Sequence, residues 1–247
     1  MSDSIAQDAR SWLPRGVQVV VLHNAVDTER FSPCGAVADL DALAGLPPAP
    51  TDTLRIGLPA TFARWKGHEV FLRSLAELKR RDIRGYLIGG AVYQTGDSQW
   101  SERELRQVIA TLGLQEQVGV TGFVDDMPSA LRALDVVVHA STRPEPFGLV
   151  IAEAMACGRL VLATRTGGAA ELFEHDVHAV GLDVAEVSTM TAALRGLLAD
   201  PERRAAIASR ARAHIVARFG RERFAVALGE ALALVADDRS AVPARQR

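Results

Sequence analysis

Short apolar runs alternate with longer amphipathic stretches along most of the chain. The apolar runs are rich in Val, Ile and Leu and mostly do not alternate with polar residues, which is typical of strands covered on both faces. The predicted strands are 17–22, 54–58, 85–89, 118–122, 135–140, 159–164 and 179–182. Helical patterns lie between them, at about 68–81, 101–113, 128–134, 147–157, 168–175 and 188–198. The alternation predicts an α/β fold: a parallel, doubly wound sheet of about six strands within residues 54–182, with helices on both faces.

The two ends of the chain depart from this alternation. A predicted helix at 4–12 and the strand at 17–22 are followed by a segment, 33–52, that holds four of the eleven prolines and is predicted to be a linker or loop. A lone helix and strand cannot bury a core of their own, so they either pack onto the main domain or belong to a domain that is absent. Two further helices, at about 201–218 and 221–236, follow the last strand.

Composition and charge narrow the classes of function. Thirty acidic against 28 basic residues leave a net charge of −2, which gives no overall attraction to nucleic acid. No apolar run reaches 18 residues, so no transmembrane segment is predicted, and the first residues lack the apolar core of a signal peptide. Cys34 and Cys157 are the only cysteines, too few for a disulfide framework, and a reducing, cytoplasmic location is the simplest interpretation.

One stretch is strongly basic. Residues 201–224 contain seven arginines and two glutamates, so contact with an acidic membrane surface or with nucleic acid stays open. The stretch lacks interleaved aromatic and large apolar side chains, which favours a solvated helix face. We therefore expect no nucleic-acid partner and at most a peripheral contact with a membrane.

The densest cluster of candidate functional residues lies at 141–158, directly after the predicted strand 135–140. Parallel sheets bind ligands outside the carboxyl ends of their strands, where helix N-termini present unpaired N–H groups. The amides of Phe147, Gly148 and Leu149 would lie at such a helix start. A glycine in the middle of this set allows an anion to approach the backbone closely.

Two glutamates, Glu145 and Glu153, flank this helix start. Glu153 is the only charge between residues 149 and 158, in a helix apolar enough to be buried nearly all round. Its carboxylate must therefore be hydrogen-bonded or protonated. Binding the vicinal hydroxyls of a ribose would satisfy it; so would a gap to solvent or a role in capping a neighbouring loop.

Two weaker motifs are expected at the same edge of the sheet. Lys66 follows the strand 54–58, and a cation there could neutralise a diphosphate, although a lone loop lysine is more often simply solvated. Gly167 and Gly168 follow the strand 159–164, where they either permit close backbone approach or merely make a tight turn.

Together these residues resemble the retaining, nucleotide-sugar-dependent glycosyltransferases of group 1, which are related to glycogen synthase and built from two Rossmann-like domains (the GT-B fold). The resemblance covers about residues 4–236, and its paired-glutamate motif is specific whereas each other piece is weak alone. The matching segments are Asn24-Ala-Val-Asp27 with Phe31-Ser-Pro33, Trp65-Lys-Gly67, Gly89-Gly90, Gly122-Phe-Val-Asp-Asp126, Glu145-Pro-Phe-Gly148 with Glu153-Ala-Met-Ala-Cys-Gly158, and Gly167-Gly168 with Glu171.

The resemblance implies roles for individual residues. Glu145 would lie against the hydroxyls of the donor sugar, Lys66 against the diphosphate and Glu153 against the ribose, which makes Glu145 and Lys66 the catalytic candidates. The other implied donor-binding residues are Phe147, Gly148 and Leu149 beside the sugar and diphosphate, and Phe123 and Val124 beside the base. Such enzymes keep the anomeric configuration and generally need no metal or other cofactor, because cationic side chains and helix dipoles stabilise the leaving diphosphate.

The chain departs from this family in two ways. The family often has an arginine five residues before the lysine, where this sequence has Thr61, so that either Arg64 substitutes for it or the charge is missing. In addition, the family's acceptor site lies on an N-terminal domain of which residues 1–32 resemble only the last helix, strand and linker. By this resemblance, residues 33–236 are the donor-binding half and 237–247 a flexible tail.

Two functions are therefore expected as alternatives. The first is a hexosyltransferase of glycan biosynthesis that transfers a sugar from a UDP- or GDP-sugar to an acceptor hydroxyl, with a separate or missing acceptor domain as its partner. The second is a non-catalytic sugar-nucleotide-binding module, or a fragment that is inactive without its acceptor-binding half.

Rival motifs are weaker. No predicted strand is followed by the Gly-x-Gly-x-x-Gly of dinucleotide-binding folds. Asp39 and Asp41 match a metal-binding Asp-x-Asp pattern, yet they lie in the proline-rich linker rather than at a strand end. His175 and His178 have the spacing of metal ligands without an obvious third ligand, so two exposed histidines are the better interpretation.

Overall fold

The sheet of the protein has the predicted topology. The computed structural model describes residues 1–92 and 98–240, except for the side chains of 235–240. Within these residues six parallel strands form one sheet: β1 (Leu54–Pro59), β2 (Ile83–Ile88), β3 (Val118–Gly122), β4 (Val136–His139), β5 (Leu160–Thr164) and β6 (Val180–Leu182). The order is β3-β2-β1-β4-β5-β6, so the direction of winding reverses between β1 and β4. Sheets of this kind bind ligands at that reversal.

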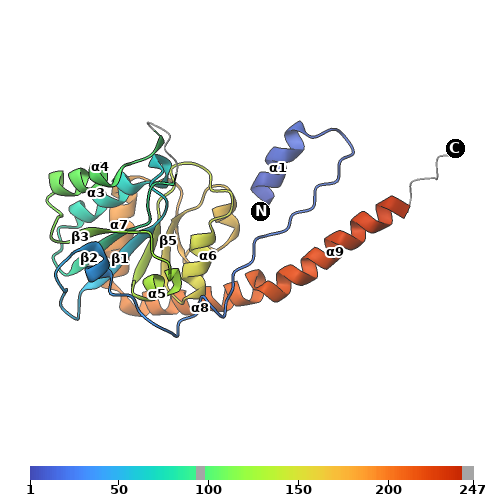
Figure 1. Ribbon diagram of the computed structural model, residues 1–247. Coiled ribbons are helices and arrows are strands. Elements are labelled where there is room, and N and C mark those ends of the chain that lie inside the picture. The colour runs from blue at the N-terminus through green and yellow to red at the C-terminus, as the bar shows by residue number, and fades with distance from the viewer. Residues whose placement is uncertain (93–97, 241–247) are drawn as a thin grey trace.

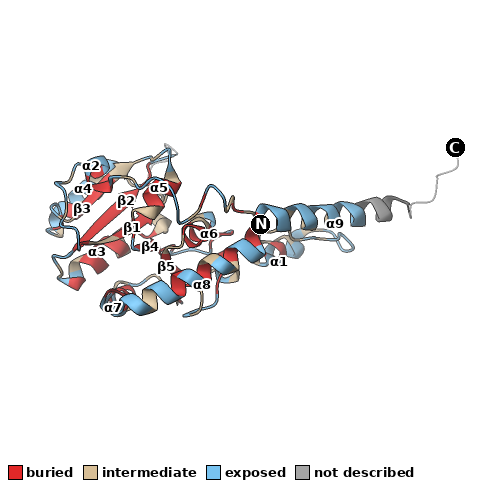
Figure 2. Ribbon diagram, turned by 90° about the horizontal axis from the view of Figure 1, so that it is seen from below, coloured by how far each residue is buried: buried red, intermediate tan, exposed pale blue. Residues whose placement is uncertain are grey.

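Helices cover both faces of the sheet, as the buried strands predict (Figures 1 and 2). One face packs against α3 (His68–Leu78), α4 (Glu102–Thr111) and α7 (Val187–Ala199). The other packs against α2 (Leu40–Ala44), α5 (Met127–Arg132), α6 (Leu149–Ala156) and α8 (Pro201–Phe219). Successive β4 side chains enter opposite cores, Val137 on the α6 side and Val136 and Val138 on the α3 side, as strand geometry requires.

Two predictions about local structure are wrong. Residues 17–22 form no strand, because the segment runs apart from the sheet and no strand of the described residues lies beside it to form a ladder of hydrogen bonds (Figure 1). The predicted helix 168–175 shortens to a 3-10 turn, η3 (Gly168–Glu171). The segment 33–52, predicted to be a linker or loop, contains the short helix α2. The Asp39 side chain caps its N-terminus, and Gly45, in the left-handed conformation, ends it.

The first and last helices lie outside the layered body. The N-terminus of α1 (Asp3–Trp12) docks on η3, where the Glu171 carboxylate accepts hydrogen bonds of 2.9 Å from the amides of Asp3 and Ser4. Helix α9 (Arg221–Ser240) extends away from the sheet and is largely exposed (Figures 1 and 2). It includes four residues of the predicted tail, and the rest of that tail, 241–247, lies outside the described residues.

Candidate active site

A cavity of about 310 Å³ lies at the carboxyl edge of the sheet where the winding reverses. The loops after β1 and β4 form its walls, and the start of α6 closes one side. It is lined by Asn24, Pro59, Ala60, Thr61, Lys66, His139, Glu145, Pro146, Phe147, Gly148, Leu149 and Val150. The structure thus brings together Lys66, Glu145, Thr61 and the three residues of the helix start that the sequence singled out.

Lys66 and Glu145 form an ion pair across this cavity. The Lys66 Nζ lies 2.6 Å from the Glu145 Oε2, and the two side chains are 17% and 11% exposed. Lys66 ends the short 3-10 turn η1 (Arg64–Lys66), which the β4 loop holds in place because the Thr142 amide donates to the Trp65 carbonyl at 2.7 Å. Gly67 then turns the chain into α3 with φ 75°, and a Cβ there would overlap the carbonyl oxygen of Ala140.

The Glu145 carboxylate is an acceptor held in its ionised form. Burial by itself raises its pKa, but hydrogen bonds from His139 and Lys66 and the positive charge of Lys66 outweigh burial and lower the pKa to about 2. The His139 Nε2 lies 3.0 Å and the Ser141 Oγ 3.1 Å from the Glu145 Oε2. At neutral pH this carboxylate has no proton to donate and can only accept hydrogen bonds.

The backbone of Glu145 is also fixed. Its amide donates to the Thr166 carbonyl at 3.2 Å, and its carbonyl accepts from the Gly168 amide at 2.7 Å. Gly167, between them, has φ 65°, and a Cβ there would press on the Glu145 backbone. The interpretation that this Gly-Gly pair permits close backbone approach is confirmed. The segment that approaches Gly167 is the backbone of Glu145.

The start of α6 favours an anion. Gly148 is its N-cap with φ 92° and offers no side chain to the amides of the first turn. The cavity-lining set includes Gly148, Leu149 and Val150, so first-turn N–H groups without a partner inside the helix, and the positive end of the helix dipole, lie at the cavity.

Glu153 lies one turn further along α6, beyond the lining residues, and is partly buried. Burial raises its pKa to about 7, which the charge of Arg30 opposes only in part. This agrees with the expectation that so apolar a helix would leave the carboxyl group without full solvation. A ligand hydroxyl that donated to it would favour its ionised form.

Besides Glu153, three other predicted donor-binding residues lie outside this cavity. Phe123, just beyond β3, is 66% exposed and lies against Gly90, whereas Val124 packs against the core on the α6 side. The Arg64 guanidinium pairs with Glu104 at 2.9 Å and lies 3.9 Å from the centre of the Trp100 ring. In this structure the Arg64 guanidinium is thus held by Glu104 and Trp100, and its role toward a diphosphate stays a prediction.

Sequence reasoning overlooked His139 and Ser141. The available signal was the position of His139, an ionisable residue that ends an otherwise apolar strand at the carboxyl edge. This signal was hard to interpret because Glu145, the partner of His139, belongs to the loop that follows the strand. Asn24 also lines the cavity, and its motif was noted only through the resemblance.

The rival metal motifs have structural roles. Asp39 caps α2, and Asp41 accepts hydrogen bonds from Tyr86 at 2.8 Å and Arg55 at 3.2 Å. The Nδ1 atoms of His175 and His178 accept hydrogen bonds from backbone amides, those of Gly181 and Glu174.

A different trio, Asp3, His23 and Glu171, brings ligand-type atoms within 4.8 Å of one another, but the Glu171 carboxylate already binds the first amides of α1 and the His23 ring. None of the helices in the described part of the chain is both long and apolar enough to cross a membrane.

Solved structures share this architecture. The chain superposes with a TM-score of 0.76 on Anabaena Alr3699/HepE in complex with UDP-glucose, at 30% identity, covering 87% of this chain and 57% of that one. It also matches a separately solved C-terminal domain, that of the group 1 glycosyl transferase LpcC from Francisella tularensis. That match has a TM-score of 0.65 at 27% identity, and it covers 79% of this chain and 99% of that domain.

Sequence relatives give the same assignment. The lipopolysaccharide core biosynthesis mannosyltransferase LpsB of Rhizobium meliloti is 31% identical over 92% of this chain and 64% of its own length. A D-inositol 3-phosphate glycosyltransferase of Xylanimonas cellulosilytica is 33% identical over 92% of this chain and 56% of its own length. The chain thus spans between half and two thirds of the length of these relatives. The model of the family "Glycosyl transferases group 1" matches residues 47–214, and the chain belongs to that family.

Proposed function

We propose that the chain binds a nucleoside-diphosphate sugar, a UDP- or GDP-sugar, in the cavity between β1 and β4 and supplies the donor half of a retaining glycosyl transfer. The observation that carries this proposal is the Lys66–Glu145 ion pair, which faces the uncapped start of α6 across one cavity. A cation, a fixed carboxylate and free amides are the groups that a sugar diphosphate needs within a few ångströms.

Each group has a separate task in the proposed reaction. The Glu145 carboxylate, ionised at neutral pH, accepts hydrogen bonds from sugar hydroxyls and orients the ring. When the bond between the anomeric carbon and the diphosphate oxygen breaks, negative charge grows on the diphosphate, and Lys66 and the first-turn amides of α6 stabilise it. Because these groups already supply positive charge, we propose that transfer needs no metal. Activity that survives EDTA would support this part.

The relatives' names support the class of donor. A mannosyltransferase that uses GDP-mannose, from Mycolicibacterium smegmatis, is 32% identical over 74% of this chain, and HepE was solved with UDP-glucose. Both lipopolysaccharide core synthesis and inositol phosphate glycosylation occur among the relatives' names. We propose glycan biosynthesis as the setting and the cytoplasm as the location, which the free thiols Cys34 and Cys157 support.

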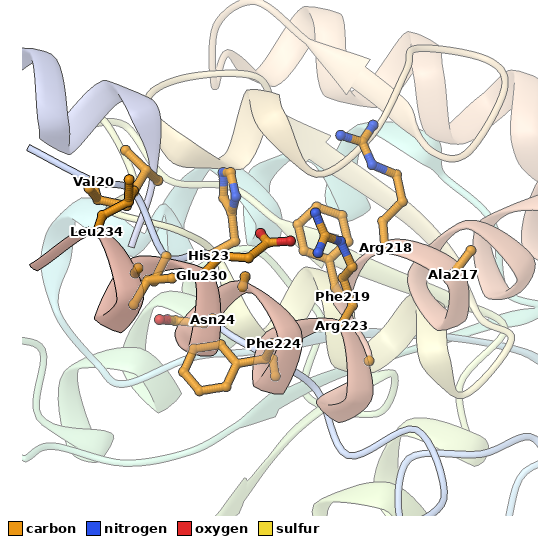
Figure 3. Close-up of a pocket in the computed structure, with 16 residues that line it drawn as sticks. Val20, His23, Asn24, Ala217, Arg218, Phe219, Arg223, Phe224, Glu230 and Leu234 are labelled. Atoms are coloured by element: carbon orange, nitrogen blue, oxygen red, sulfur yellow. The ribbon is translucent and has the colours of Figure 1, made fainter. Parts of the chain in front are cut away.

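The partner proposed for this half is a second Rossmann-like domain that holds the acceptor. A further cavity, of about 370 Å³, opens between residues 20–25 and the helices α8 and α9 (Figure 3). Large apolar side chains are exposed in or near it: Val20 is 44%, Leu232 61% and Leu234 48% exposed. An uncovered apolar surface of this kind fits a docking face for another domain.

Calorimetric titration of the 247-residue protein with UDP and GDP tests the donor site. A transfer assay tests whether sugar transfer needs a separate acceptor domain. We expect nucleotide binding with slow or undetectable transfer by the chain alone, because no acceptor hydroxyl is held near the anomeric carbon. Addition of a separately expressed acceptor domain should restore transfer. Rapid transfer by the chain alone would contradict the need for that partner, and absence of binding to both nucleotides would contradict the proposed function.

A further inference from the structure

The two oxygens of Glu145 are treated differently by the protein. Oε2 faces three donors: the Lys66 Nζ at 2.6 Å, the His139 Nε2 at 3.0 Å and the Ser141 Oγ at 3.1 Å. Among the described residues no donor reaches Oε1 within hydrogen-bond distance. The side chain keeps 11% of its surface exposed and lines the cavity, so the unpaired oxygen is the one left for a ligand.

The surroundings of His139 determine where its proton lies. The side chain is 4% exposed, and its Nδ1 atom is buried without a hydrogen-bond partner among the residues that the structure describes. A proton on Nδ1 would leave a buried donor unsatisfied, whereas a proton on Nε2 points at the Glu145 carboxylate. The His139 ring therefore donates from Nε2, and the Ser141 hydroxyl donates to the same carboxylate oxygen.

These two donors differ from Lys66 in rigidity. His139 is the last residue of β4 and is held by the sheet, and the Ser141 carbonyl accepts a 2.9 Å hydrogen bond from the buried Thr164 hydroxyl. Lys66 carries its charge on a flexible four-carbon chain. A diphosphate that drew Lys66 away from Glu145 would therefore leave the bonds from His139 and Ser141 in place.

We propose that His139 and Ser141 are positioning residues that hold the Glu145 Oε2 and thereby direct Oε1 alone toward the hydroxyls of the donor sugar. This inference rests on the proposed function, because the sugar is the ligand that Oε1 receives. It predicts that losing either donor weakens recognition of the sugar while recognition of the nucleotide persists, because both residues act through the Glu145 carboxylate.

The first test follows the Glu145 carboxyl group by ¹³C NMR in protein labelled at glutamate, with Glu145→Gln to assign its signal. In the parent this carboxyl group should stay ionised to the lowest pH at which the protein is folded. His139→Leu and Ser141→Ala each remove a donor to the charged form and should raise its pKa by about one unit. His139→Gln keeps an N–H donor and should restore the parent behaviour, which a merely structural role of the ring does not predict.

The second test compares two affinities, those for UDP-glucose and UDP, with GDP-mannose and GDP as the alternative pair. We expect the preference for the sugar-bearing ligand to fall about tenfold in His139→Leu and Ser141→Ala, with the affinity for the nucleotide unchanged. Ser74→Ala, at another fully buried serine away from the cavity, is the matched control.

The outcomes separate the inference from the proposed function. If the parent binds neither nucleotide, the proposed function fails, and the carboxyl titration still decides whether His139 and Ser141 hold Glu145. If His139→Leu does not fold, Ser141→Ala and His139→Gln carry the test. A Glu145 titration and a sugar preference that both stay at parent values in Ser141→Ala would overturn the inference.

Discussion

Lys66 and Glu145 are 79 positions apart in the sequence, and their side chains meet at 2.6 Å where the sheet reverses its winding. Each follows a different central strand, Lys66 after β1 and Glu145 after β4, and these strands are neighbours in the sheet. The pairing therefore depends on the topology, and it places one positive and one negative group at the mouth of a single cavity.

Replacing Lys66 should weaken binding of diphosphates more than that of monophosphates. Lys66→Gln removes the charge that lies at the cavity, and we expect about a tenfold or greater loss of affinity for UDP or GDP, with a small change for UMP or GMP. The control is Lys79→Gln. Lys79 is the chain's only other lysine, and it is exposed at the end of α3. Equal losses for both kinds of nucleotide in calorimetry would place the diphosphate elsewhere.

Glu153 should make nucleotide binding depend on pH near neutrality. Its pKa of about 7 means that the carboxyl group is largely protonated below that pH, whereas a ribose hydroxyl that donates to it favours the ionised form. Affinity should therefore rise as pH increases from 6 to 8, with release of a proton on binding.

Glu153→Gln should remove this pH dependence and weaken the binding of ligands that carry a ribose by about 1–3 kcal/mol. Calorimetry in buffers of different ionisation enthalpy measures the proton release directly. The exposed Glu116→Gln is the control, and a pH profile that Glu153→Gln leaves intact would show that another group titrates.

Glu145 should contribute to stability in a pH-dependent way. Its pKa in the folded protein, about 2, lies below the ordinary value of 4.5, so its contribution is complete above pH 5 and is lost as pH falls toward 2. The shift corresponds to about 3 kcal/mol in the free energy of unfolding. The free energies of unfolding of the parent and of Glu145→Gln, measured by urea denaturation between pH 3 and 7, should converge as the pH falls. A difference between them that does not change with pH would contradict this prediction.

Two glycines should respond in opposite ways to alanine. Gly67→Ala introduces a Cβ at φ 75° that overlaps the Ala140 carbonyl, and we expect it to lower the free energy of unfolding by about 2 kcal/mol or more. Gly196, inside α7, has open space around it, and Gly196→Ala should raise stability by about 0.5–1 kcal/mol. Thermal unfolding of both variants checks the pair, and a neutral Gly67→Ala would contradict the tight turn that positions Lys66.

The regular part of this fold could be predicted because its signals are local. The strands from residue 54 to 182 are apolar runs, and parallel strands must place their carboxyl ends at one edge, which located the helix start at Gly148 and the lysine at 66. The segment 17–22 has the same apolar pattern and forms no strand, because a strand also needs a neighbour that the pattern cannot reveal.

The sequence could not predict which side chains contact one another in the site. Arg64 is a predicted diphosphate ligand by position, and the sequence does not reveal that Glu104 and Trp100 contact its guanidinium in the fold. His139 was missed for the converse reason, since only the folded β4 loop brings Glu145 back to its Nε2 atom.

A crystal structure of the 247-residue protein with UDP-glucose or GDP-mannose tests the central claim most directly. We expect the diphosphate between the Lys66 Nζ and the first amides of α6, the sugar against the Glu145 carboxylate and the ribose against Glu153. A nucleotide bound elsewhere, for example in the cavity beside α9, or a cavity between β1 and β4 that stays empty at saturating ligand, would contradict this account.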